Sequence, residues 1–205
     1  MTEIHLNILL LGDSAVGKTS LLMKYINNEF KDSHIATNGI DYKKKNLQIK
    51  NLNIELNLID TSGNEKTKSI SYIYNQDIDG IIFVFDVTNY QSFEKINDYL
   101  TELEKSGNDY LYVLIGNKID LQNIIQVNEE KVLENYKFKK IYFQTSAKEN
   151  KNVSIPFEEL TKLILKKLDE EGSIAYRDEN NVKTFRLRKN NLEYNPDIYS
   201  SKCCK

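Results

Sequence analysis

Residues 12–19 carry the clearest chemical signature in the chain: Gly-Asp-Ser-Ala-Val-Gly-Lys-Thr. They match a spacing of glycine, four residues of any type, and then Gly-Lys-Ser or Gly-Lys-Thr. Glycine lets the backbone come close to a phosphate, and N–H groups at the start of the following helix point at the anion. The run therefore predicts a loop that cradles nucleotide phosphates, with a chance glycine-rich turn as the alternative.

Two side chains of this loop have distinct chemistry. The Lys18 ammonium would neutralise charge on the β- and γ-phosphates, which makes it a candidate catalytic residue, and the Thr19 hydroxyl would bind Mg²⁺. The candidate phosphate-binding residues of the loop are Ser14, Ala15, Val16, Gly17, Lys18, Thr19 and Ser20. Small-molecule kinases and many ATPases share such a loop, so it does not select the base.

The sequence Asn-Lys-Ile-Asp at residues 117–120 offers a way to select guanine. The Asp120 carboxylate can accept two parallel hydrogen bonds from guanine N1–H and the exocyclic amine. Adenine has an acceptor at N1 and no amine at C2, so the acid would be left unpaired. Lys118 would lie along the base and Asn117 would tie neighbouring loops together. An ordinary polar loop is the alternative.

Two further loops follow strand-like runs. Asp60 ends one such run and would hold Mg²⁺ through water, while the N–H of Gly63 would sense a γ-phosphate. Residues 145–148 read Thr-Ser-Ala-Lys and follow another run. In a doubly wound sheet they would lie where ligands bind, so Ser146, Ala147 and Lys148 are candidates for contact with the purine.

The elements that must position these loops alternate along the chain. Apolar or alternating runs predict strands over 5–11, 47–49, 54–60, 80–87, 110–116 and 141–144. Helical periodicity is found over 20–28, 90–105 and 154–169. The order β-α-β-β-α-β-α-β-α-β-α predicts an α/β fold, with a mostly parallel sheet covered by helices on both faces.

Composition limits the class of protein. The 205 residues include 40% hydrophobic side chains and two prolines, which excludes a wholly disordered chain. A net charge of −2 gives no sign of nucleic-acid binding. No apolar run reaches the ~20 residues of a membrane span and no basic leader precedes one, so we expect a cytoplasmic protein. We assign residues 1–171 to one domain and 172–205 to a mildly basic, flexible tail; a packed extra helix is the alternative.

In order and spacing, these motifs resemble those of the Ras-type small GTPases. Residues 39–42, 84–88 and the terminal Cys-Cys-Lys resemble the Rab branch in particular. The resemblance implies a P-loop NTPase fold with a six-stranded sheet, GTP/GDP switching, Mg²⁺ and a role in vesicle-mediated transport. It also implies an exchange factor, a GTPase-activating protein and effectors as partners, and we expect a monomer.

The resemblance assigns further residues. Thr37 would contact Mg²⁺ and the γ-phosphate, and Phe30 would pack edge-on against the guanine. Tyr42, Ile59 and Tyr74 fall where Rab proteins carry a hydrophobic effector triad.

Asn64 departs from the family pattern, because it stands where a catalytic Gln orients the attacking water. Its side chain is one methylene shorter, and positioning supplies most of the catalysis in phosphoryl transfer. We therefore expect a switch that hydrolyses GTP slowly. A GTP-binding scaffold with negligible hydrolysis is the second hypothesis. A P-loop kinase is the third, although the sequence shows neither a lid nor an acceptor site.

The only two cysteines, Cys203 and Cys204, lie at the end of the chain. By resemblance to Rab proteins they would both carry geranylgeranyl groups, and two lipid chains give stable anchoring where one is marginal. This predicts reversible attachment to the cytosolic face of an endomembrane. Two exposed thiols without a role are the alternative.

Overall fold

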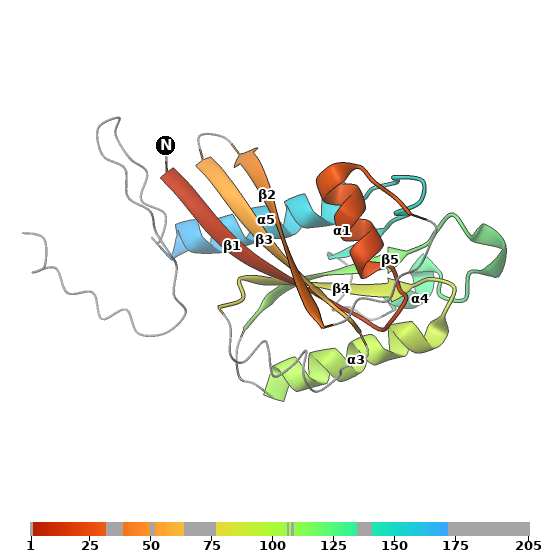
Figure 1. The fold of residues 1–205 in the computed structure, drawn as a ribbon. Helices are drawn as coiled ribbons and strands as arrows, with labels where there is room; N and C mark the ends of the chain where they lie inside the picture. Colours follow the sequence, from red (N-terminus) through yellow and green to blue (C-terminus); the bar gives the residue numbers. More distant parts are fainter. Residues whose placement is uncertain are drawn as a thin grey trace, which may run out of the picture.

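A computed structural model describes residues 2–31, 39–49, 52–63, 77–105, 107, 109–134 and 141–171 of the chain. Six strands form one twisted sheet with helices packed on it (Figure 1). The strands are β1 (Thr2–Leu11), β2 (Ile40–Ile49), β3 (Leu52–Thr61), β4 (Gly80–Asp86), β5 (Leu111–Asn117) and β6 (Tyr142–Gln144). The helices are α1 (Lys18–Asn27), α3 (Tyr90–Lys105), the 3-10 helix η1 (Gln122–Ile124), α4 (Glu129–Leu133) and α5 (Ser154–Glu170).

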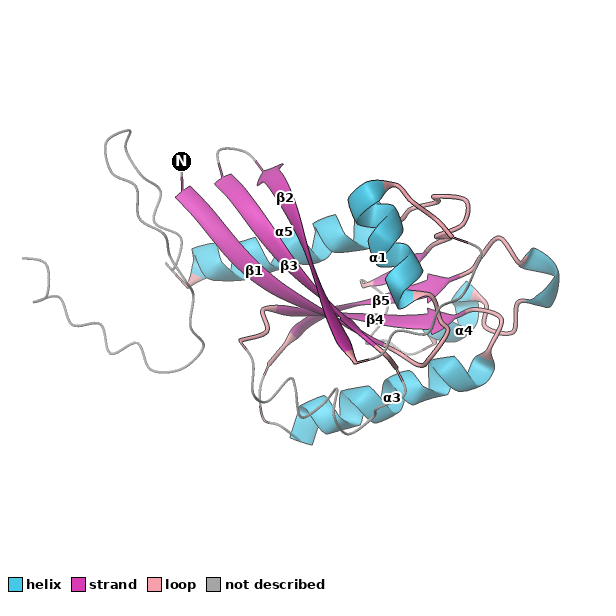
Figure 2. Ribbon diagram, in the orientation of Figure 1, coloured by secondary structure: helices cyan, strands magenta, loops and turns pink. Residues whose placement is uncertain are grey.

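The strand order is β2-β3-β1-β4-β5-β6, and only the β2–β3 pair is antiparallel. The predicted α/β fold with a six-stranded, mostly parallel sheet is thus confirmed. Figure 2 shows α3 on the opposite face of the sheet from α1 and α5. The predicted element between β3 and β4 lies outside the described residues.

Side chains on the two faces of β1 belong to two separate hydrophobic cores. Ile8 and Leu10 pack with α1 and α5, whereas Leu9 and Leu11 pack with α3. All seven residues of β4 are buried, as expected for a strand covered on both sides. The near-continuous apolar runs of the sequence are therefore explained by burial from both faces.

The expected bounds of several elements were wrong: β1 begins at Thr2 rather than His5, and β3 runs over Leu52–Thr61 rather than 54–60. β2 runs over ten residues rather than the three expected, because it is an edge strand in which Lys43, Lys44 and Lys45 interrupt the apolar alternation. Helix α1 begins at Lys18 rather than at Ser20. Gly17 is its N-cap with φ 98°, so the helix starts directly at the loop lysine.

The carboxyl ends of β1, β4 and β5 lie at the same edge of the sheet, because these strands are parallel. The loops that follow them therefore meet there, as in other doubly wound folds. In the described part of the chain no helix is both long and apolar enough to cross a bilayer.

Candidate functional site

The loop between β1 and α1 is held in a conformation that few residues adopt. Gly17 and Ala15 both have positive φ, 98° and 62° respectively. For alanine this left-handed conformation is unfavourable, so neighbouring groups must hold it. One such group is Lys118, whose Nζ donates to the Ala15 carbonyl at 2.8 Å.

Lys18 is a buried cation at the start of α1, with only 5% of its surface exposed. Its Nζ donates to the carbonyl oxygens of Gly12 at 3.0 Å and Asp13 at 2.8 Å. Burial lowers the pKa of Lys18 to about 8, and the nearby carboxylates of Asp60 and Asp13 oppose this shift. A cation desolvated to this degree would interact strongly with an anionic phosphate.

Asp60 and Thr19 form a pair suited to Mg²⁺. The Thr19 hydroxyl donates to Asp60 Oδ2, while the other carboxylate oxygen, Oδ1, is buried and has no hydrogen-bond partner in the described structure. Burial raises the pKa of Asp60. Carboxylate and hydroxyl oxygens are hard ligands of the kind Mg²⁺ takes, so these residues fit the ion.

Other metal centres find no support within the described ranges. No group of three or more His, Cys, Asp or Glu side chains comes together there as a metal site. A site with only two protein ligands is still consistent with Mg²⁺, because this ion usually completes its coordination shell with water and substrate phosphates.

Gly63 lies directly against the phosphate loop. A Cβ at this position would stand 2.6 Å from Lys18 Nζ and 2.6 Å from the Ser14 nitrogen, and Gly63 has φ 76°. Both space and backbone conformation therefore require glycine. Gly63, selected from the sequence as a γ-phosphate sensor, is next to the lysine assigned to the same phosphate.

Asn117 connects three loops at the end of β5. Its Nδ2 donates to the Val16 carbonyl at 3.0 Å. Its Oδ1 accepts from the Thr145 hydroxyl at 3.1 Å and from the Ala147 N–H at 3.3 Å. This is the tying role expected of Asn117, and it sets the phosphate loop against the proposed base-binding loops.

Lys118 and Asp120 follow Asn117 at the carboxyl end of β5. The Ser146 hydroxyl donates to Asp120 Oδ1 at 2.7 Å, which fixes the carboxylate in one orientation. Lys118 Nζ forms an ion pair with Asp86 Oδ2 at 2.7 Å. Lys118 thus links the end of β4 to the phosphate loop, a contact that the sequence did not predict.

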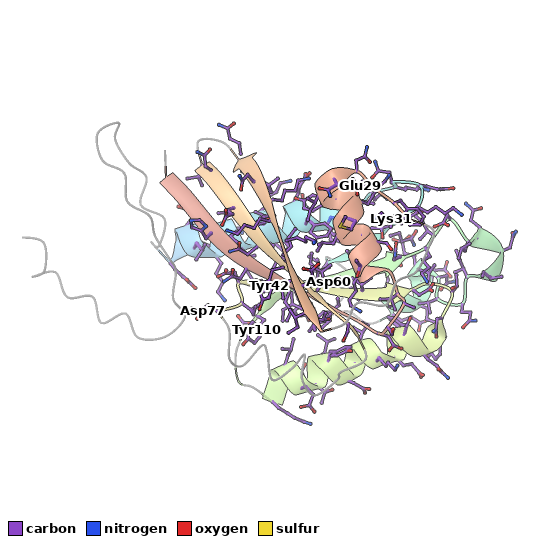
Figure 3. The ribbon with its side chains drawn as sticks, in the orientation of Figure 1. Glu29, Lys31, Tyr42, Asp60, Asp77 and Tyr110 are labelled. Carbon is purple, nitrogen blue, oxygen red and sulfur yellow. The ribbon has the colours of Figure 1, made fainter. Side chains whose placement is uncertain are left out.

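A single cleft of about 450 Å³ joins the phosphate loop to the proposed base-binding loops, while Asp60, Gly63 and Ser146 are not among its lining residues. It is lined by Ser14, Ala15, Gly17, Lys18, Thr19, Ser20, Phe30, Asn117, Lys118, Asp120, Ala147 and Lys148, all selected from the sequence. Figure 3 labels Glu29 and Lys31, which follow α1 and also line the cleft, and Asp60 at the end of β3. Groups suited to phosphate and groups suited to a purine therefore face the same space.

Comparison with known proteins decides the family. The Ras family model matches residues 7–166. Rab-2B of Dictyostelium discoideum is 37% identical over 175 residues, covering 84% of this chain and 87% of the relative. RABG3b of Arabidopsis thaliana is 38% identical over 169 residues (78% and 83%), and human Rab-15 is 30% identical over 205 residues (98% and 97%). The chain belongs to the Rab branch of the Ras-type small GTPases.

Several residues that were expected to contribute to the nucleotide site or the effector surface of this GTPase are buried in the core or lie outside the described residues. The Val16 side chain is buried in the core, so only its backbone is available to the site. Ile59 of the expected effector triad is buried against α3, whereas Tyr42 is 58% exposed. Thr37, Asn64, Tyr74, Cys203 and Cys204 lie outside the described residues.

The GTPase cleft also contains residues that the sequence did not single out. These are Met23, Glu29, Lys31, Thr61, Ser62 and Leu121. Most of them are immediate neighbours of predicted residues, so their position next to a motif could have indicated that they line the cleft. Met23 stands one helical turn after Thr19, a spacing that helix geometry would have indicated.

Proposed function

We propose that this small GTPase is a guanine-nucleotide switch that hydrolyses GTP slowly and recruits effectors in vesicle-mediated transport. The observation that carries the proposal is the shared cleft, in which Lys18 and Asp120 line the same cavity. A site with Lys18 but without Asp120 would bind phosphate without selecting a base. A site with Asp120 but without Lys18 would bind a nucleoside.

In this proposal each group has one task. Lys18 and the loop N–H groups hold the phosphates, and Asp120, oriented by Ser146, reads the guanine edge. Thr19 and Asp60 would hold Mg²⁺, which when bound neutralises charge on the β- and γ-phosphates. Phe30 lines the cleft and packs partly against the core, where it would cover the base.

Switching would depend on segments that contact the γ-phosphate. We assign Thr37 and Gly63 to this task, since such contacts are released when the phosphate is cleaved. The exposed side chains Ile40 and Tyr42 on β2 would belong to the surface that effectors recognise. We assign residues 1–171 to the GTPase domain and 172–205 to a tether whose cysteines attach it to an endomembrane.

The decisive experiment measures bound nucleotide and its turnover. Protein purified with Mg²⁺ should contain GDP or GTP identified by mass, and GTP should displace it far better than ATP. Single-turnover GTP cleavage should be slow, and Asn64→Gln should accelerate it by roughly tenfold, because the longer amide reaches the attacking water.

Three results would change the proposal. Equal cleavage rates for the parent protein and Asn64→Gln would exclude Asn64 as the cause of slow hydrolysis. No detectable cleavage by the parent protein, with or without a candidate activating protein, would favour the scaffold function. ATP binding as tight as GTP binding would exclude the guanine switch altogether.

A further inference from the structure

Asp13 places a carboxylate in the loop proposed to bind the nucleotide phosphates. It is the second residue of the loop, and an uncompensated carboxylate there would repel a polyphosphate. The structure shows how this charge is compensated. Asp13 Oδ2 forms an ion pair with Lys95 Nζ, and Oδ1 accepts from the Ser14 N–H at 2.9 Å.

Lys95 belongs to a helix that is firmly fixed to the sheet. It lies on α3, whose neighbouring residues Phe93, Ile96 and Tyr99 are buried in one core with Leu9 and Leu11 of β1. Figure 1 shows α3 along the face of the sheet opposite to α1 and α5. The ammonium group is therefore presented to the phosphate loop from a rigid support.

Asp13 also connects Lys95 to Lys18, the proposed catalytic lysine. The carboxylate of Asp13 is held by Lys95, and the carbonyl oxygen of the same residue accepts from Lys18 Nζ at 2.8 Å. The side chains of Asp13 and Lys95 are only 21% and 32% exposed, so solvent screens their interaction incompletely. A change at Lys95 therefore alters both the charge and the position of the loop that holds Lys18.

We propose that Lys95 is a positioning residue of the nucleotide site: it neutralises Asp13 and anchors the phosphate loop to α3. This inference rests on the proposed function, because it concerns binding of the nucleotide phosphates. Without the ammonium group, Asp13 leaves a negative charge beside the bound polyphosphate, and the loop loses its link to α3. Nucleotide then dissociates faster.

The test compares dissociation of a fluorescent GDP analogue, chased with unlabelled GDP and Mg²⁺, across a set of variants of the full chain. Lys95→Met should accelerate dissociation by roughly tenfold, since a partly buried partner loses its counter-charge. Lys95→Arg, which keeps the charge, should remain within about threefold of the parent. The double variant Asp13→Asn with Lys95→Met should recover most of the loss, because no unpaired charge remains.

A matched control separates this effect from general helix damage. Lys105 lies on the same helix and pairs with Glu102 at 2.7 Å, so Lys105→Met removes a lysine and an exposed ion pair at the far end of α3. It should leave the dissociation rate unchanged. Thermal unfolding of every variant, measured with GDP bound, should show that all are folded.

The outcomes distinguish failure of the inference about Lys95 from failure of the proposed function. A rate for Lys95→Met equal to that of the parent would overturn the inference while leaving the proposed function intact. A double variant as fast as Lys95→Met would overturn the neutralising role of Lys95, because the loss would then not depend on the charge of Asp13. Failure of the parent protein to bind GDP at all would refute the proposed function itself.

Discussion

At the scale of single residues, Lys18 is a cation held where burial favours its neutral form. Its pKa, lowered to about 8, reflects desolvation that nearby Asp60 and Asp13 only partly offset. Binding a phosphate would supply the missing negative charge and favour the protonated lysine. The affinity of the site should therefore depend on pH near this pKa.

We expect GDP affinity to fall as pH rises through 8. Below this pH Lys18 is already charged in the free protein; above it, binding must also add a proton, which costs up to about tenfold in affinity per pH unit. Titration with a fluorescent GDP analogue between pH 7 and 9 measures the effect. Lys18→Arg stays charged and should have a flatter profile, so parallel profiles for the two proteins would contradict the assignment.

Asp120 gives a second prediction at this scale. Asp120→Asn replaces an acceptor by a donor, so guanosine nucleotides should bind roughly a hundredfold more weakly. Xanthosine nucleotides carry a carbonyl at C2 and should bind better to the variant than to the parent. Competition between GDP and xanthosine diphosphate measures both changes, and a variant that still prefers GDP would show that Asp120 does not read the base.

At the scale of elements, helices α1 and α5 are joined by an aromatic stack. The rings of Tyr25 and Phe157 lie 4.1 Å apart at an interplanar angle of 8°. Lys45 of β2 places its Nζ over the Tyr25 ring, 4.0 Å from the centroid, and donates to the Tyr25 carbonyl. One aromatic pair therefore connects both helices to the edge of the sheet.

Removing one ring of this stack should destabilise the domain. Phe157 is fully buried, so Phe157→Ala should lower the free energy of unfolding by about 3–5 kcal/mol. Tyr25→Phe is a matched control: the buried Tyr25 hydroxyl has no hydrogen-bond partner in the described structure, so its removal should cost nothing. Denaturant unfolding measures both, and equal losses would contradict this account.

At the scale of the whole molecule, the sequence predicted those features that depend on local chemistry. Strand β1, the glycine-rich loop and helix α1 are contiguous, so their order predicts their arrangement, although not the start of the helix at Lys18. Asn117 and Asp120 could also be placed, because parallel strands bring their carboxyl ends together. The family prediction, drawn from four such motifs, is confirmed.

Contacts between distant side chains could not be predicted in this way. Lys95 and Asp13 are 82 positions apart, and a lysine on a helix surface has the same appearance in sequence whether or not it has a partner. The burial of Ile59 depends on where α3 packs. The full length of β2 was missed because an edge strand does not need an alternating apolar pattern.

The proposed attachment to membranes can be tested on the whole molecule. We expect the protein from cells to sediment with membranes, and the double change Cys203→Ser with Cys204→Ser to release it into the supernatant. Each single change should give an intermediate distribution, because one lipid chain binds only marginally. Membrane association of the double variant would refute the lipid anchor.

The open edge of the sheet has a consequence for crowding. β2 is the last strand at one end of the described sheet, and a second copy could extend the sheet there. Three consecutive lysines, Lys43 to Lys45, lie along this border, and Lys44 is 67% exposed. Lysines on an edge strand disfavour its pairing with another strand, so we expect the protein to stay monomeric even at high concentration.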